Sequence, residues 1–228
     1  MQRQSYDTVH ESYGKNRPPD PPQTMKRKSK NSEEYNQPSE QELLNRINNM
    51  REPYKSYAAF SYLFGNRVSE GIGGKSKYKT RGIDNIREYK PILAGDITIE
   101  NGWIEVTHVP TLKRKVRDIN KFYRDMIVLQ TGQGEKPFIN ILLQHIENKR
   151  PEEPLWTHNR RTQWYHCNKH LQIPPKVLRS LRAKKDAKVY HLGALELKEK
   201  YNWGSTDMPF FYAKYNKEAL KKKMEESQ

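Results

Sequence analysis

Apolar residues recur every three to four positions along parts of this chain, which is the spacing of one face of an α-helix. Segment 55–72 has apolar residues at positions 59, 60, 63, 64 and 68, and segment 137–149 is strongly amphipathic. Segment 160–171 has a similar helical character. The pattern therefore predicts one helix early in the chain and two in its second half.

Local capping signals predict the starts of further helices. Ser39 and Glu42 have the spacing of a capping box, which predicts a helix over about residues 40–50. Pro174 and Pro175 stand where a helix begins, so that the string KVLRSLRAKK forms its first turns. The last string of the sequence, NKEALKKKMEESQ, has a helix-forming composition and predicts a detachable terminal helix.

Segments rich in β-forming residues lie between these helices. Residues 97–106 are predicted to form two strands joined at Asn101-Gly102, a dipeptide that favours a tight hairpin turn. Residues 124–130 predict a third strand. Helices, then a small antiparallel sheet, then more helices together predict a mostly helical α+β fold.

The first part of the chain differs from the rest in composition. Residues 1–40 contain no Leu, Ile, Phe or Trp, and they include the string PPDPP. Such a segment buries too little apolar surface to offset the entropy that ordering costs. The sequence therefore predicts a disordered polar tail over residues 1–38 and one folded domain over residues 39–228.

Charge and cysteine content narrow the class of partner. The 228 residues include 42 Lys and Arg against 27 Asp and Glu, a formal net charge of +15. This balance favours a polyanion as the partner, nucleic acid ahead of an anionic membrane, with a merely basic protein as the alternative. The lone Cys167 excludes an intramolecular disulfide and fits a reducing compartment. Because no apolar run has the length of a membrane span or the character of a signal peptide, we expect a soluble, intracellular protein.

Three short strings carry the sharpest chemical signal: GNRVSE, KVLR and NWGSTDMPFFY. They place Arg67, Arg179 and Tyr212 in an order that suits attack of a tyrosine on a DNA phosphate. Strand cleavage without a metal needs a nucleophile, cations around the pentacoordinate phosphorus and an acid for the leaving 5′ oxygen. Two arginine forks can grip the non-bridging oxygens and stay charged. A lysine can serve as the acid where neighbouring cations lower its pKa.

These strings resemble the motifs of the tyrosine recombinases, or phage-type integrases. GNRVSE is similar to the helix-borne first motif of that family, which makes Arg67 the first catalytic arginine and Glu70 the residue that orients it. KVLR resembles the second motif, usually His-x-x-Arg, so that Arg179 is the second arginine. Lys176 stands where most members have His, and in this it is similar to the integrases of spindle-shaped archaeal viruses.

The same resemblance assigns the nucleophile and the phosphate contacts. Tyr212 is the expected nucleophile, and Tyr215, three residues further on, is the rival. Trp203 lies nine residues before Tyr212, where members of the family carry the His or Trp that contacts the phosphate. By the same likeness, Lys176 and Trp203 hydrogen-bond or position that phosphate.

The catalytic lysine of the family lies in the turn between the second and third strands of its sheet. The corresponding segment here is THVPTLKRKVRDINKFYRD. Lys113 is our choice for the acid that protonates the leaving 5′ oxygen. Lys115 is the near alternative, and His108 is a more distant one.

The resemblance also implies a fold and a reaction. We expect residues 39–228 to form a tyrosine recombinase catalytic domain with a small three-stranded antiparallel sheet. The implied activity is site-specific recombination or integration of double-stranded DNA through a 3′-phosphotyrosyl intermediate, by a homotetramer on paired sites. Residues 215–228 are then the helix that docks onto a neighbouring subunit. This chemistry requires neither a metal ion nor a cofactor.

Other functions stay open at this stage. The chain could be a DNA-binding protein that keeps the fold without catalysis, or a DNA-relaxing enzyme similar to the type IB topoisomerases. Most members of the family have an N-terminal helical domain that clamps the far face of DNA, and residues 1–40 are too short and too polar for it.

Each motif also has an ordinary structural alternative. Arg67 and Glu70 could form a simple ion pair on a helix surface. Tyr212 could be a packed aromatic residue. Arg179 and Lys176 could belong to a solvated basic face that includes Arg182, Lys184 and Lys185.

The string GIGGKS at 71–76 imitates a phosphate-binding loop. Ser69 occupies the position of a required glycine, and the string follows a helix, whereas a phosphate loop follows a strand. We therefore expect a flexible, glycine-rich exit from the helix of Arg67 and no nucleotide site.

A group of histidines and a cysteine imitates a zinc site. The residues concerned are His158, His166, Cys167 and His170. A spacing of four residues on a helix can bind zinc, but no acidic ligand and no second cysteine completes the set. We expect ordinary polar residues on a helix here and no bound metal.

Overall fold

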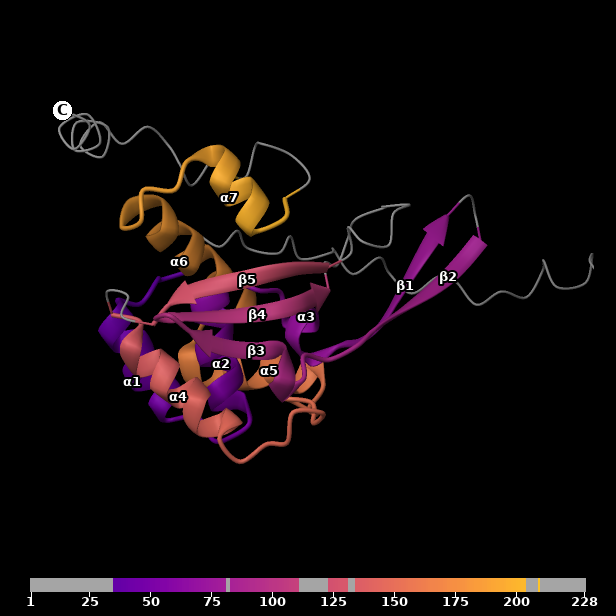
Figure 1. The fold of residues 1–228 in the computed structure, drawn as a ribbon, viewed down its shortest axis with the longest axis horizontal. Coiled ribbons are helices and arrows are strands. Elements are labelled where there is room, and N and C mark those ends of the chain that lie inside the picture. The colour runs from indigo at the N-terminus through magenta and orange to yellow at the C-terminus, as the bar shows by residue number, and fades with distance from the viewer. Residues whose placement is uncertain (1–34, 81–82, 111–122, 131–133, 204–208, 210–228) are drawn as a thin grey trace, which may run out of the picture. The chain divides into compact units, whose positions relative to one another are not determined.

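A computed structural model describes residues 35–80, 83–110, 123–130, 134–203 and 209 of this protein. All of these residues belong to one unit of the chain, Ser32–Gln228. In chain order the elements (Figure 1) are α1 (Glu40–Asn48), α2 (Tyr54–Phe64), α3 (Val68–Ile72), β1 (Gly74–Thr80), β2 (Ile83–Tyr89), the 3-10 turn η2 (Ala94–Asp96), β3 (Ile97–Glu100), β4 (Trp103–Pro110), β5 (Tyr123–Leu129), α4 (Lys136–Ile146), α5 (Arg160–His166), the π-helical turn η4 (Cys167–Leu171), α6 (Pro175–Lys188) and α7 (Ala194–Lys200).

Several helices begin where their local signals predict. The Ser39 hydroxyl accepts a hydrogen bond from the backbone N–H of Glu42 at 3.2 Å and starts α1. Helix α6 begins at Pro175, as predicted. Helix α4 covers most of the predicted segment 137–149 and carries Pro137 in its first turn. A backbone N–H has no partner within the helix at this place, so a proline costs no hydrogen bond. These predictions are confirmed. They could be made from the sequence because each signal acts within one helical turn.

The predicted helix over 160–171 forms in two parts, and one helix was not predicted. The Asn159 side chain accepts from the backbone N–H of Thr162 at 2.9 Å and caps α5. Helical winding continues through η4 and ends before Gln172, which is in the left-handed conformation. Helix α7 corresponds to none of the elements predicted from the sequence.

The prediction of a single helix over residues 55–72 is wrong, because the chain breaks at Gly65. Helix α2 ends at Phe64, and Gly65 caps it in the left-handed conformation with a φ of 59°. A Cβ on this residue would lie 2.4 Å from Cε1 of Tyr201, so the position accepts only glycine. The helical spacing of apolar residues continues across the break, which concealed it in the sequence.

The predicted three-stranded antiparallel sheet is confirmed, with strand order β3-β4-β5. Asn101 and Gly102 have positive φ values of 50° and 79° and form the tight turn between β3 and β4. Strand β5 occupies the segment predicted as the third strand, and a register shift interrupts its pairing with β4 between Val106 and Val109.

A second, two-stranded ribbon, β1–β2, was not predicted. The string GIGGKS leads directly into β1, so the expected exit loop is wrong from Gly74 onwards. Gly73 has a φ of 77°, and a Cβ there would lie 2.8 Å from the carbonyl oxygen of Tyr89. Glycine therefore allows the start of β1 to pass close to the end of β2. The sequence of β1, GKSKYKT, has no apolar face of the kind that marks a half-buried strand.

Helix α2 is the centre of the hydrophobic core. Every residue from 56 to 64 is buried, and the helix contacts α1, α4, α6 and β5. A helix that is covered on all sides belongs in the interior of a domain. Alternate residues of the sheet, Ile104, Val106, Met126 and Val128, are buried in the same cluster. Within the described parts of the chain, no helix combines the length and the apolarity needed to cross a bilayer.

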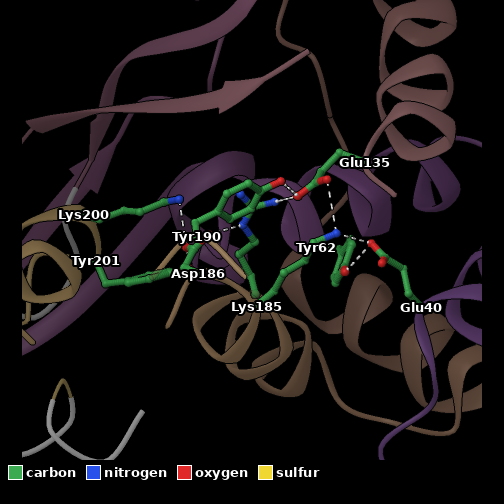
Figure 2. Close-up of polar contacts among 9 residues, drawn as sticks. Glu40, Tyr62, Glu135, Lys185, Asp186, Tyr190, Lys200 and Tyr201 are labelled. Atoms are coloured by element: carbon green, nitrogen blue, oxygen red, sulfur yellow. Dashed lines mark hydrogen bonds and ion pairs between the residues drawn. The ribbon is translucent and has the colours of Figure 1, made fainter. Parts of the chain in front are cut away.

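Helix α6 directs charged side chains into the protein. Arg182 is 2% exposed, and it donates from Nε to Asp186 at 2.8 Å and from Nη1 to Glu135 at 2.9 Å. The Lys185 ammonium lies 2.7 Å from Glu40 and 3.2 Å from Glu135. Figure 2 shows the contacts of Lys185 with Glu40 and Glu135. The alternative of a solvated basic face is therefore wrong for Arg182 and Lys185.

This buried ionic network joins four helices, through residues that belong to them or directly precede them. Glu40 is the first residue of α1, Glu135 directly precedes α4, and Arg182, Lys185 and Asp186 belong to α6. The end of α7 joins through Lys200, whose ammonium lies 2.8 Å from Asp186. A buried charge without a partner costs several kcal/mol, so these elements cannot move independently.

We predict that Arg182→Ala strongly destabilises the protein. The substitution leaves two buried carboxylates short of a cation, and the expected loss is about 3–5 kcal/mol in the free energy of unfolding, measured by urea denaturation. Arg150→Ala is the control, because the Arg150 side chain is 75% exposed and pairs with Glu153 at the surface. That variant should lose about 0.5 kcal/mol or less. Equal losses in the two variants would contradict the structural role given to Arg182.

Candidate active site

The turn between α2 and α3 is held by side-chain hydrogen bonds to its backbone. The Asn66 amide donates to the carbonyl of Arg67 and to the Tyr57 hydroxyl, both at 3.0 Å. The Tyr57 hydroxyl in turn donates to the carbonyl of Val68 at 2.6 Å. Burial raises the pKa of Tyr57, so the hydroxyl keeps its proton. The position of the Arg67 backbone is thereby fixed.

Arg67 directly precedes α3, whereas the motif led us to expect it within a helix. Its backbone N–H donates to Oε2 of Glu70 at 2.7 Å, and its Nη1 donates to Oε1 of the same carboxylate at 2.8 Å. Glu70 is fully buried, and the Arg67 side chain is 29% exposed. One buried carboxylate therefore holds both the backbone and the guanidinium of Arg67. The alternative of an ordinary surface pair is wrong, because Glu70 is not on the surface.

Arg179 reaches the same carboxylate from α6. Its Nη1 lies 3.5 Å from Oε2 of Glu70 and donates to the carbonyl of Gly65 at 2.9 Å. Its Nη2 donates to the carbonyl of Tyr201 at 2.8 Å. The Arg179 side chain is 11% exposed. The structure thus brings together the two arginines that the sequence motifs single out.

Both arginines of this cluster pair with one carboxylate. The guanidinium groups of Arg67 and Arg179 stay protonated at any relevant pH, and each contacts Glu70. Arg67 is the more exposed of the two, with 29% of its side chain accessible against 11% for Arg179. Guanidinium forks of this kind can bind a phosphate-like group through two oxygens at once.

Trp203 lies beside Arg179. The Arg179 guanidinium is 5.7 Å from the centre of the Trp203 ring and 5.0 Å from that of Tyr201. The two rings stack on each other with centroids 4.8 Å apart. Asn202 between them has a positive φ of 48°, which makes the turn that directs both rings toward Arg179. Trp203 therefore joins the cluster of Arg67, Glu70 and Arg179.

Lys176 is in the same helix as Arg179, within the first turn, and is exposed. Its ammonium lies 5.5 Å from the centre of the Tyr35 ring, and Tyr35 packs against the hydrophobic core. A cation at this distance over an aromatic ring is weakly stabilised.

The other residues predicted for catalysis lie outside the described part of the chain. Lys113 and Lys115 belong to the segment between β4 and β5, and Tyr212 and Tyr215 follow α7. His108 belongs to β4, but its side chain is not described. Their roles stay predictions.

Sequence reasoning missed one residue of the cluster, Tyr201. Its carbonyl accepts a hydrogen bond from Arg179, and its ring lies near the Arg179 guanidinium. The ring also packs against Gly65. The only signal in the sequence is its place two residues before Trp203. An aromatic residue at such a place is usually predicted to be part of the core, and Tyr201 is indeed fully buried.

The histidine group is built into an aromatic cluster. The ring of His166 stacks on Tyr54 at 3.7 Å, and His158 meets the edge of the same tyrosine at 4.8 Å. Burial lowers the pKa of His158 to about 4, and it also lowers that of His166. Burial raises the pKa of the Cys167 thiol to about 12. Among the described residues, no three His, Cys, Asp or Glu side chains are grouped so that they could hold a metal ion.

We predict that the protein becomes less stable as the pH decreases, because of His158. Its pKa is about 6.5 in the unfolded chain and about 4 in the folded protein, so the stabilisation is complete above pH 6.5 and is lost as the pH falls toward 4. After allowance for solvent screening, the expected loss is about 1–2 kcal/mol. Urea denaturation at pH 7 and pH 4.5 measures it, and His158→Gln should lose less over this interval than the wild type. The same loss in both proteins would contradict the assignment.

Comparison with known proteins identifies the fold. No protein-family model matches this sequence, and no curated protein resembles it in sequence. The XerH site-specific recombinase, solved in a pre-cleavage complex with its difH substrate, is similar in structure with a TM-score of 0.52 and 11% identity. The match covers 81% of this chain and 51% of XerH. The Tn1549 transposon integrase, solved with circular intermediate DNA, has a TM-score of 0.50 and 12% identity over 83% of this chain and 65% of that one.

These similarities concern the fold, since the sequences are so different. This chain spans about half of the XerH chain and about two thirds of the solved integrase chain. The expected fold class is confirmed: the protein has the mostly helical α+β fold, with a small antiparallel sheet, of tyrosine recombinase catalytic domains.

Proposed function

We propose that this protein is a site-specific DNA recombinase, or integrase, that cleaves and rejoins DNA through a 3′-phosphotyrosyl intermediate. The observation that carries the proposal is the pairing of Arg67 and Arg179 on the buried carboxylate of Glu70. These are the two arginines of the recombinase-like motifs, and the fold around them is that of proteins solved in complex with DNA.

In the proposed reaction the arginines stabilise the charge that develops on the phosphorane. Donors held in place before the reaction act most strongly, because no reorganisation is needed as charge develops. The contacts of Arg179 with the carbonyls of Gly65 and Tyr201 and with Glu70 provide this preorganisation. Trp203 beside Arg179, and Lys176, close to it in α6, are assigned to positioning the phosphate.

Tyr212 is the proposed nucleophile. Its phenol gives up its proton to solvent, the oxygen forms a bond to phosphorus, and the bond from phosphorus to the 5′ oxygen of DNA breaks. Lys113 donates the proton that the departing 5′ oxygen takes up, with Lys115 as the alternative acid. The ester retains the bond energy, so a 5′ hydroxyl from a partner duplex can reverse the step and complete strand exchange.

The partner in this proposal is double-stranded DNA, bound at paired sites by a homotetramer inside the host cell. The net charge of +15 favours contacts with the DNA backbone, which should weaken as salt rises. Residues 39–228 act as the catalytic domain behind a polar segment over residues 1–38, and residues 215–228 dock onto a neighbouring subunit.

We predict a covalent protein–DNA adduct on nicked suicide duplexes, which prevent religation. A duplex library with a randomised target region supplies the unknown site, and denaturing gels with mass spectrometry locate the modified residue. Tyr212→Phe should abolish the adduct, because it removes the nucleophilic oxygen. Tyr215→Phe is the matched control and should retain it.

The outcomes separate the candidate functions. DNA binding without any adduct would favour a non-catalytic DNA-binding protein. An adduct accompanied by relaxation of supercoiled DNA, but without recombinants from two sites, would favour a topoisomerase-like enzyme. An adduct that persists in Tyr212→Phe and vanishes in Tyr215→Phe would transfer the nucleophile to Tyr215.

We predict that Arg67→Lys and Arg179→Lys each lower the single-turnover rate of adduct formation by about 10²–10³-fold. Lysine keeps the charge but loses the planar fork that donates to two oxygens. The dissociation constant for the same duplex should change little, because the positive charge is retained. Rates close to the wild-type value in both variants would exclude these arginines from phosphate stabilisation.

A further inference from the structure

Tyr201 contacts the guanidinium of Arg179 through both its backbone carbonyl and its ring, although no motif marks it. Its carbonyl accepts from Nη2 of Arg179 at 2.8 Å, and the guanidinium lies 5.0 Å from the centre of its ring. The same ring stacks on Trp203 at 4.8 Å. One residue thus contacts two of the groups that the proposed reaction places around the phosphate.

The ring of Tyr201 also packs against Gly65, in the turn before Arg67. The position of a Cβ on Gly65 would be 2.4 Å from Cε1 and 3.1 Å from the hydroxyl oxygen of Tyr201. The Gly65 carbonyl is also the acceptor for Nη1 of Arg179. Tyr201 and Gly65 therefore pack directly on each other, and each supplies one backbone carbonyl to the same guanidinium.

The hydroxyl of Tyr201 is anchored in the buried ionic network. It donates to Oδ2 of Asp186 at 2.5 Å, as Figure 2 shows. Asp186 is fully buried, and Arg182 and Lys200 each lie 2.8 Å from its carboxylate. Burial raises the pKa of Tyr201 well above its ordinary value, so the phenol stays a donor.

We propose that Tyr201 is a positioning residue for Arg179 and Trp203, and that Asp186 acts on them through the Tyr201 hydroxyl. The inference rests on the proposed function and adds a residue to it. Two carbonyls fix the plane of the Arg179 guanidinium, and the position of the Tyr201 carbonyl depends on a side chain tied at its far end. Loss of the hydroxyl keeps the aromatic ring but removes its anchor, so that the ring and the carbonyl of Tyr201 are positioned less precisely.

Tyr201→Phe tests this inference, with Tyr62→Phe as the matched control. Tyr62 is also a buried tyrosine whose hydroxyl donates to a carboxylate of the network, that of Glu40 at 2.8 Å. Its ring packs against Phe138. Figure 2 shows Tyr62 and Glu40 at one end of the network and Tyr201 at the other. Each substitution removes a tyrosine hydroxyl that donates to a carboxylate of the network, but only Tyr201 adjoins Arg179.

We predict that Tyr201→Phe lowers the single-turnover rate of adduct formation by about 10-fold or more, since small misplacements of catalytic groups are costly. The dissociation constant for DNA should stay within about twofold of the wild-type value, because no charge changes. Tyr62→Phe should lower the Tm to a similar extent while keeping the wild-type rate. A rate in Tyr201→Phe equal to the wild-type rate, or equal loss of rate in both variants, would overturn the inference.

A second measurement needs no cleavage. Phenylglyoxal modifies accessible guanidinium groups, and mass spectrometry gives the rate at each arginine in the DNA-free protein. Arg179 should react faster in Tyr201→Phe than in the wild type or in Tyr62→Phe, while the exposed Arg150 reacts equally in all three. An unchanged Arg179 rate would refute the positioning role. If the wild type forms no adduct, the proposed function fails, and this measurement still decides the role of Tyr201.

A double substitution tests the route through Asp186. If Asp186 acts on Arg179 through the Tyr201 hydroxyl, Asp186→Asn should accelerate the modification of Arg179 in the wild-type background and add little in the Tyr201→Phe background. Additive effects would show that Asp186 acts by another path, and that part of the inference would be wrong.

Discussion

The buried ion pair between Arg182 and Asp186 is the constraint on which the arrangement of this structure depends. Both side chains are removed from water, so the loss of a partner by either one lowers the free energy of unfolding by several kcal/mol. Their other contacts extend to Glu135 before α4 and to Lys200 at the end of α7. Lys185, also paired with Glu135, continues the network to Glu40 in α1. Elements far apart in the sequence are thus tied to one face of α6.

Glu70 plays the corresponding part in the candidate site. Its carboxylate is buried and accepts from the backbone and the side chain of Arg67, and it also pairs with Arg179. Without this carboxylate, the like charges of Arg67 and Arg179 would repel each other. Glu70 therefore allows the fold to hold both arginines close together. The folding energy of the domain therefore supplies the preorganisation that the proposed phosphate chemistry requires.

The sequence predicted the parts of the fold whose signals are local. The cap at Ser39, the proline start of α6 and the Asn101-Gly102 turn act over a few residues, and each was found where expected. The break at Gly65 was missed because its cause is tertiary: the ring of Tyr201, distant in the sequence, lies where a Cβ would stand. The ribbon β1–β2 was missed because its sequence lacks an apolar face.

The candidate site divides in the same way. Arg67, Glu70, Arg179 and Trp203 could be selected by motif, and the structure brings them together. The burial of Arg182 could not be predicted, because an arginine followed by lysines has the composition of a solvated helix face. Tyr201 was missed because its importance lies in its carbonyl and in what holds its hydroxyl. Neither property has a signature in the residue type.

The two clusters are connected through the helical repeat of α6. Arg179, Arg182 and Asp186 are spaced by three and four residues and so lie along one side of the helix. A rotation of α6 that moved Arg179 away from Glu70 and the two carbonyls would also move Arg182 and Asp186 away from their partners. An apolar core tolerates small rotations at modest cost, whereas buried charges do not. The network is therefore well suited to hold α6 in the one orientation that aims Arg179 at the site.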